Sequence, residues 1–174
     1  MRKPSVFRKS AEIIQKHYSD KLILVKMGPY EEHDKKKWLE LVGAFMEGGG
    51  DGISAVNTYK VLRSEVPSQH WGYESAGKSG HDLRPYRMRA VKDTRKTFPE
   101  SVIFATGGIF DATDTYETFC EGSNAVQGYT PYAFYGLGLV PKLMKGVLRI
   151  LQRNGYVRLE KLLEAKRRCD DLVY

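Results

Sequence analysis

The chain has 174 residues, 41% of them hydrophobic and 7 of them proline, so it can bury one sizeable core and is neither disordered nor fibrous. Its apolar runs are too short to cross a bilayer and its 2 cysteines cannot form a disulfide framework, which predicts a cytoplasmic protein with no membrane contact. The net charge is +7, but aromatic residues do not interleave with the basic clusters as a base-stacking surface requires. We therefore expect no nucleic-acid partner, and we expect the basic residues to lie on solvated helix faces.

The first elements are a helix, a strand and a second helix. Residues 5–18 predict a helix with Ile13 and Ile14 on its buried side, and residues 22–27 predict a strand. Residues 34–46 carry hydrophobic side chains at helical period, and three glycines follow them.

The middle of the chain holds two further strands and a segment without a pattern. Residues 52–56 predict the second strand, and residues 59–82 then form a long loop that we place beside the active site, since long loops in compact proteins are usually functional. Residues 83–98 predict a basic amphipathic helix and residues 102–106 the third strand.

The last third completes the alternation of strand and helix. Residues 111–120 predict a short helix, 125–127 the fourth strand, 140–154 a core helix and 157–174 a helical tail. This order predicts an α/β fold with parallel strands joined by helices, in one domain of residues 1–174.

Glycine-rich turns follow the last two predicted strands. Gly107 and Gly108 lie between a strand and a helix start, where backbone N–H groups can face a phosphate, and Gly128, Tyr129 and Thr130 repeat that placement one unit later. Each turn alone is equally typical of a tight connection. Together they match the phosphate site after the last two strands of a (β/α)₈ barrel.

Two polar residues follow apolar runs at strand ends. Lys26 lies in a strand so apolar that its charge needs a partner or a ligand, or else must reach solvent along its own stem. Asn57 follows the second strand, where its amide can recognise the edge of a planar ligand or bond the backbone of a turn. The sequence leaves both pairs of alternatives open. The scattered histidines and cysteines predict no metal site.

Residues 72–79 fit the P-loop pattern of nucleotide triphosphatases. The context contradicts that reading, because the preceding segment is polar and contains Pro67, and because Gly80 and His81 follow where a helix should begin. We therefore expect Lys78 to be a mobile-loop residue that does not bind a triphosphate.

Five ordered motifs resemble the dihydroorotate dehydrogenase superfamily over residues 22–156, and they match the C-terminal half of that family's flavin-binding barrel. The motifs are Val25-Lys26-Met27-Gly28-Pro29, Gly50-Asp51-Gly52-Ile53-Ser54-Ala55-Val56-Asn57-Thr58, Gly77-Lys78-Ser79-Gly80 with Leu83-Arg84-Pro85, Ala105-Thr106-Gly107-Gly108-Ile109, and Val126-Gln127-Gly128-Tyr129-Thr130.

The resemblance implies FMN as the cofactor and a dihydropyrimidine as the substrate. Lys26 would contact the flavin ring, and Asn57 with Thr58 would face the substrate. The residues implied along the ribityl phosphate are Ser79, Gly80, Gly107, Gly108, Gly128, Tyr129 and Thr130. One departure is Ala76-Gly77, where the family has a glycine pair.

The implied reaction is oxidation of dihydroorotate to orotate in pyrimidine biosynthesis, with hydride transfer to FMN. The family's catalytic Ser or Cys lies in a loop before the lysine strand, and the residues that precede Leu22 contain no candidate for it. The catalytic residue is therefore unknown. An alternative is a phosphate- or flavin-binding or assembly module that has lost the catalytic base.

Four strands predict a half barrel with two open sheet edges, since a closed barrel has eight. We expect a homodimer or a second chain to complete it, or else the chain to be a remnant or a truncated form. The apolar inner face that we expect to need cover consists of Ile23, Val25, Ile53, Ala55, Ile103, Ala105 and Val126.

Overall fold

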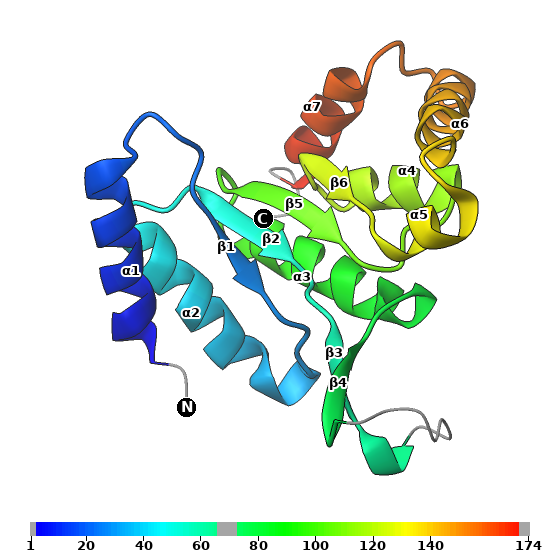
Figure 1. The fold of residues 1–174 in the computed structure, drawn as a ribbon. Coiled ribbons are helices and arrows are strands. Elements are labelled where there is room, and N and C mark those ends of the chain that lie inside the picture. Colours follow the sequence, from blue (N-terminus) through cyan, green and yellow to red (C-terminus); the bar gives the residue numbers. More distant parts are fainter. Residues whose placement is uncertain (1–2, 66–72, 171–174) are drawn as a thin grey trace.

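The computed structural model describes residues 3–65 and 73–170, with side chains described as far as residue 165. The elements in chain order are α1 Pro4–His17, β1 Leu24–Met27, η1 Glu32–Asp34, α2 Lys35–Glu47, β2 Gly52–Ala55, β3 Tyr59–Leu62, η2 Arg63–Glu65, β4 Ser75–Lys78, η3 His81–Leu83, α3 Arg84–Thr97, β5 Val102–Thr106, α4 Ala112–Cys120, β6 Ala125–Gln127, α5 Thr130–Tyr135, α6 Leu139–Arg153 and α7 Leu159–Asp170 (Figure 1).

Strands β1, β2, β5 and β6 form one parallel sheet in that order. Each pair of neighbours is connected through a helix, so all four carboxyl ends meet at one edge of the sheet (Figure 1). The α/β class and the four parallel β/α units are therefore confirmed. The carboxyl edge carries the turns that the sequence singled out.

One face of the sheet is covered by helices α2 and α3. Ile53 and Ile103, both 0% exposed, belong to the same buried cluster as Trp38 and Val42 of α2 and Val91 of α3. The expectation that this apolar face needs further cover was wrong: it packs on the chain's own helices.

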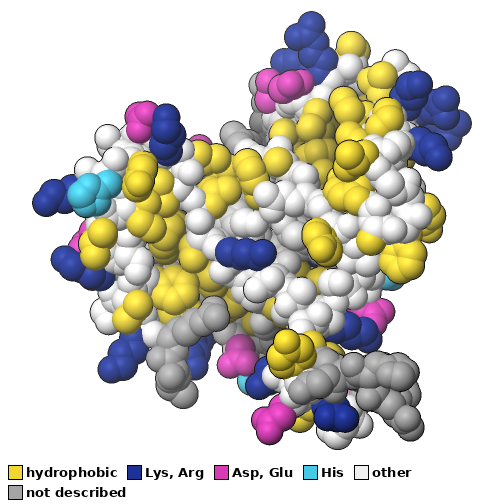
Figure 2. Space-filling model, in the orientation of Figure 1, with side chains coloured by type: hydrophobic (Ala, Val, Ile, Leu, Met, Phe, Trp, Pro, Cys, Tyr) yellow, Lys and Arg dark blue, Asp and Glu magenta, His cyan; other side chains and the backbone are white. Residues whose placement is uncertain are grey.

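The opposite face of the sheet is the open one. In the strand register Lys26 pairs with Ser54, Ser54 with Phe104 and Phe104 with Ala125, so these side chains project from the same side. Lys26 is exposed and the other three are half-buried. Figure 2 shows a largely white centre on this face, between hydrophobic patches on two flanks.

Helix α1 packs on α2 with a different side from the one expected. Ala11 is 0% exposed and lies in a cluster with Ile23 and Phe45, whereas Ile13 is 51% and Ile14 39% exposed. The prediction of a buried Ile13 and Ile14 was wrong, because the helix turns its small residue to α2 and its branched residues outward.

Strands β3 and β4 form an antiparallel ribbon within the segment that the sequence predicted to be irregular. Tyr59 pairs with Lys78 and Leu62 with Ser75, and the ribbon extends from the carboxyl edge of the sheet (Figure 1). A Cβ added to Gly77 would lie 2.2 Å from Thr58 Oγ1, so glycine permits this close crossing. Residues 66–72 lie outside the described residues.

The helices of the second half pack as a separate cluster beside β6. Phe119 of α4, Val147 and Leu151 of α6 and Leu162 of α7 are its buried members. No helix within residues 3–65 and 73–170 is long and apolar enough to span a membrane.

Candidate functional site

Three segments that are distant in the sequence converge at the carboxyl edge of the sheet. The Thr130 hydroxyl donates to Ser79 Oγ at 2.9 Å, which joins the turn after β6 to the end of the ribbon. A Cβ added to Gly80 would have Thr130 Cγ2 as its nearest neighbour, at 3.9 Å. Ser79, Gly80 and Thr130 are therefore brought together.

The turn after β5 packs on the beginning of α3. Gly107 and Gly108 have φ angles of +102° and +66°, a region that disfavours every residue with a Cβ. A Cβ on Gly108 would lie 2.7 Å from Arg84 N and 2.9 Å from His81 O, so the turn needs glycine for space as well as for conformation. Among the described residues, the Gly108 N–H has no backbone or side-chain acceptor.

The remaining members of the turn after β6 lie less centrally. The side chain of Tyr129 is 83% exposed, and Gly128 lies against the ring of Tyr132 from α5. Tyr129 therefore reaches a ligand only from the open side of the site.

The structure places Lys26 and Asn57 on neighbouring strands at the same edge. Asn57 N donates to Met27 O at 2.8 Å, which ties the segment after β2 to the end of β1. Asn57 and Thr58 are exposed, as is Lys26. Within the described part of the chain no hydrogen bond or ion pair engages the Lys26 ammonium, so it is available to a ligand on the open face.

A polar network crosses three strands on the open face, and the sequence analysis assigned it no role. The hydroxyls of Ser54 and Thr106 donate to Gln127 Oε1 at 3.0 and 2.8 Å. Both lone pairs of that oxygen are then used, and the amide N–H₂ of Gln127 remains for another acceptor. The signal was present as three polar residues at alternate positions of otherwise apolar strands.

Two arginines of α3 are buried, which corrects the expectation that its basic residues are all solvated. Arg87 is 0% and Arg95 is 7% exposed. Arg95 Nη1 donates to Ser101 O at 2.9 Å and its Nη2 to Asn124 Oδ1 at 2.8 Å, so Arg95 fastens the start of β5 to the start of β6. Arg87 lies under the glycine turn, where its Nη1 donates to Gly107 O at 2.5 Å. Helical spacing alone gave no sign of either burial.

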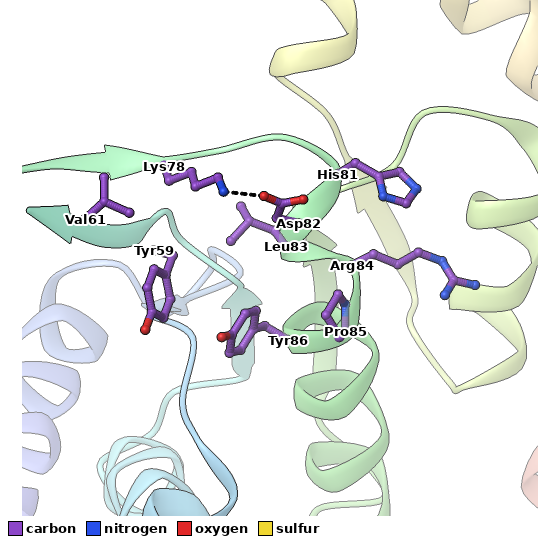
Figure 3. A pocket seen from close by; sticks show the side chains of 9 residues that line it. All are labelled: Tyr59, Val61, Lys78, His81, Asp82, Leu83, Arg84, Pro85 and Tyr86. Carbon is purple, nitrogen blue, oxygen red and sulfur yellow. Dashed lines mark ion pairs between the residues drawn. The ribbon is translucent and has the colours of Figure 1, made fainter. Parts of the chain in front are cut away.

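A pocket of about 570 Å³ lies where the ribbon meets η3 and α3 (Figure 3). The rings of Tyr59 and Tyr86 stack on one side with centroids 5.5 Å apart. An ion pair between Lys78 and Asp82 bounds the other side and lowers the pKa of the Asp82 carboxyl. Figure 3 shows the side chains of His81 and Arg84 pointing away from the two tyrosines. This pocket contains none of the residues implied for the cofactor.

The P-loop match is not a phosphate loop in the structure. Lys78 lies in β4 and pairs with Asp82, so the expectation of a mobile-loop residue was wrong. Residues 75–78 form an extended strand, whereas the backbone of a P-loop wraps around a phosphate.

We expect no ATP binding at this segment, because Lys78 is already paired and its backbone N–H groups serve a ribbon. Isothermal titration calorimetry with ATP should show no saturation in the micromolar range for the wild-type chain or for Lys78→Ala. Micromolar binding that disappears in Lys78→Ala would show that the segment is a nucleotide site.

Parallel strands joined by helices, with a lysine and glycine turns at their carboxyl edge, define a protein of the (β/α)-barrel type, a class whose ligand sites lie at that edge. The family model described as Dihydroorotate dehydrogenase matches residues 3–151. The chain therefore belongs to the dihydroorotate dehydrogenase family, which confirms the resemblance seen in the motifs.

The similar proteins include enzymes whose names give different electron acceptors. The chain is 28% identical to a dihydroorotate dehydrogenase (quinone) of Helicobacter acinonychis, over 86% of this chain and 41% of that protein. It is 29% identical to the catalytic subunit of a dihydroorotate dehydrogenase B (NAD(+)) of Saccharolobus solfataricus, over 76% of this chain and 44% of that protein.

A solved structure shows the same arrangement of elements. The crystal structure of the Eimeria tenella enzyme in complex with ferulenol superimposes with a TM-score of 0.69 and 26% identity, over 82% of this chain and 37% of that chain. The chain thus spans less than half the length of each of these three relatives.

Proposed function

We propose that this chain forms the FMN- and substrate-binding half of an enzyme that oxidises dihydroorotate to orotate in pyrimidine biosynthesis. The observation that carries the proposal is the convergence of Ser79, Gly80, Gly108 and Thr130 at the sheet edge where Lys26 is also exposed. When bound there, FMN would accept the hydride that leaves the dihydropyrimidine, and the protein's part is to bind and orient both molecules.

The residues present fit a flavin phosphate. The Gly108 N–H lacks an acceptor among the described residues, and the Ser79 hydroxyl, which accepts from Thr130, still has its own proton to donate. Backbone N–H groups freed of side chains are the usual phosphate donors at such turns. The set that we assign to the ribityl phosphate is Ser79, Gly80, Gly107, Gly108, Gly128, Tyr129 and Thr130.

We assign Lys26 to the flavin ring, and Asn57 with Thr58 to the substrate. Lys26 lies in β1, Asn57 and Thr58 follow β2, and the bond from Asn57 N to Met27 O joins the two segments. An ammonium group there can stabilise negative charge on a ring that gains a hydride, and an amide can both donate to and accept from a pyrimidine edge.

We expect Asn57→Ala to weaken orotate binding about tenfold or more, because a buried hydrogen-bonded pair in the complex would be lost. The measurement is calorimetric titration of the chain with orotate, with Lys60→Ala as a control, since Lys60 lies in the exposed ribbon three residues further on. An affinity unchanged in Asn57→Ala would remove Asn57 from the substrate site.

We propose that a further four-stranded unit covers the open face and pairs with the edges of β1 and β6, since unpaired parallel edges are unfavourable. A second copy and another polypeptide would both supply strands.

The alternative is a binding or assembly module that has lost catalysis. It shares the phosphate site with the first proposal, and it would bind a flavin or a phosphate without oxidising a substrate. Assays of turnover and of FMN binding on the same sample separate the two: binding without turnover after the barrel is completed supports the module.

A further inference from the structure

Arg87 is the most buried charged residue of the chain's core, and it is poorly satisfied. Its side chain is 0% exposed, its Nη1 donates to Gly107 O at 2.5 Å, and its Nη2 contacts Met88 Sδ at 3.6 Å. Its Nε has no hydrogen-bond partner within the described residues. Five N–H donors therefore make a single hydrogen bond to oxygen.

The other buried arginine of α3 shows how a structural arginine is satisfied in this protein. Arg95 donates from Nε and Nη2 to Gly122 O, from Nη1 to Ser101 O and from Nη2 to Asn124 Oδ1, at 2.8–2.9 Å. Its role in fastening two strands explains its burial. Arg87 makes no such set of hydrogen bonds, so a role in packing does not explain why a charged residue is buried at this position.

Among the side chains that the structure describes, no carboxylate contacts the Arg87 guanidinium directly. Asp114 is the acid with the largest electrostatic effect on the pKa of Arg87. Its two carboxylate oxygens, however, accept hydrogen bonds from Arg84 Nε and from Phe110 N, each at 3.0 Å. Burial lowers the pKa of Arg87 to about 10, so the guanidinium stays protonated at neutral pH. A buried charge without a partner is costly unless an anion is bound close to it.

The bond from Arg87 fixes the direction of one peptide group in the phosphate turn. The peptide between Gly107 and Gly108 is trans, and in a trans peptide the C=O and N–H point in opposite directions. With the carbonyl held toward Arg87 on α3, the Gly108 N–H points to the other side of the turn, where it lacks an acceptor.

We propose that Arg87 is the positioning residue for the phosphate of the bound flavin. It holds the Gly107 carbonyl so that the Gly108 N–H faces the phosphate, and it places a positive charge behind that turn. The inference rests on the proposed flavin site and adds to it a specific requirement: the protein distinguishes a phosphorylated flavin from an unphosphorylated one through a residue that does not line the open site.

The test compares FMN with riboflavin, which has the same ring and ribityl chain but no phosphate. Fluorescence-quenching titrations of the full chain give both dissociation constants for the wild type, Arg87→Met, Arg87→Lys and the control Arg95→Met. We expect Arg87→Met to weaken FMN about tenfold or more while riboflavin changes less than about twofold, because a charge-assisted contribution is lost. Arg87→Lys should recover part of the FMN affinity, and Arg95→Met should lower thermal stability without changing the FMN-to-riboflavin ratio.

The outcomes separate this inference from the proposed function. Equal loss of FMN and riboflavin affinity in Arg87→Met, or no loss, would overturn the role of Arg87 while leaving a flavin site in place. If Arg87→Met does not fold, Arg87→Lys decides by the same ratio of FMN to riboflavin affinity.

Inorganic phosphate is the second probe. If phosphate stabilises the wild type and Arg87→Lys weakens that effect, while neither flavin binds, the result would support the anion site and reject the flavin function. A wild type that binds neither flavin nor phosphate would overturn both.

Discussion

Replacement of Gly108 by valine is expected to abolish FMN binding. The φ angle of +66° is unfavourable for a branched residue, and the new Cβ would lie 2.7 Å from Arg84 N and 2.9 Å from His81 O, both backbone atoms that cannot move aside. The turn would shift and its N–H would no longer face the phosphate. Equilibrium titration with FMN measures the loss, which we expect to exceed about a hundredfold.

The control for this change is Gly138→Val, since no atom lies within 4 Å of a Cβ added there and the φ angle of −61° suits any residue. Circular dichroism shows whether each variant is folded, and Gly108→Ala provides a milder change at the same position. A folded Gly108→Val protein with wild-type FMN affinity would show that the phosphate does not bind at this turn.

The chain alone is expected to oxidise dihydroorotate slower than an ordinary enzyme by about 10²–10⁴-fold, the usual effect of a missing general base. The substrate would also lie on an open face, where water reaches Lys26 and Asn57 from the side that a further four strands would cover. The rate of orotate formation at saturating FMN measures this, with molar mass determined on the same sample by light scattering.

A monomer of this chain that forms orotate at ordinary enzyme rates would contradict both the need for a completing unit and the absence of a base. A slow monomer is the expected result. An assembly of two copies with full activity would show instead that the second copy supplies the missing strands and a base.

The position of the site was predictable because it depends on the chain's order of elements. Short apolar runs alternating with amphipathic segments require parallel strands, and parallel strands bring their carboxyl ends to one edge. Gly108 and Thr130 follow two such strands directly, so their approach to the ligand edge follows from local sequence. The structure adds the bond between Thr130 and Ser79, which closes the site from the ribbon side.

Which face of the sheet packs on the helices was not predictable from the same patterns. Ser54 and Ile53 are neighbours in a run of four residues, and which of the two faces the helices depends on the register with α2 and α3. The prediction of which side of α1 is buried failed for a similar reason, because both sides of that helix carry hydrophobic residues. Arg87 was missed since a basic residue at helical spacing gives no sign of burial under a turn twenty residues away.

The ribbon was missed because both of its strands are short and β4 carries no large hydrophobic residue. Ser75-Ala76-Gly77-Lys78 has neither the β-branched residues nor the alternation typical of a strand, and its pairing with Tyr59–Leu62 stabilises it through the backbone. Its match to a P-loop pattern is a coincidence of residue types in a different local structure.

The central claim is that this chain presents a phosphate-specific flavin site at the carboxyl edge of its sheet. An equilibrium titration of FMN with the purified wild-type chain, followed by displacement with inorganic phosphate, tests it most directly. We predict saturable quenching of flavin fluorescence that phosphate reverses. A titration without saturation, or binding that phosphate does not affect, would contradict the claim.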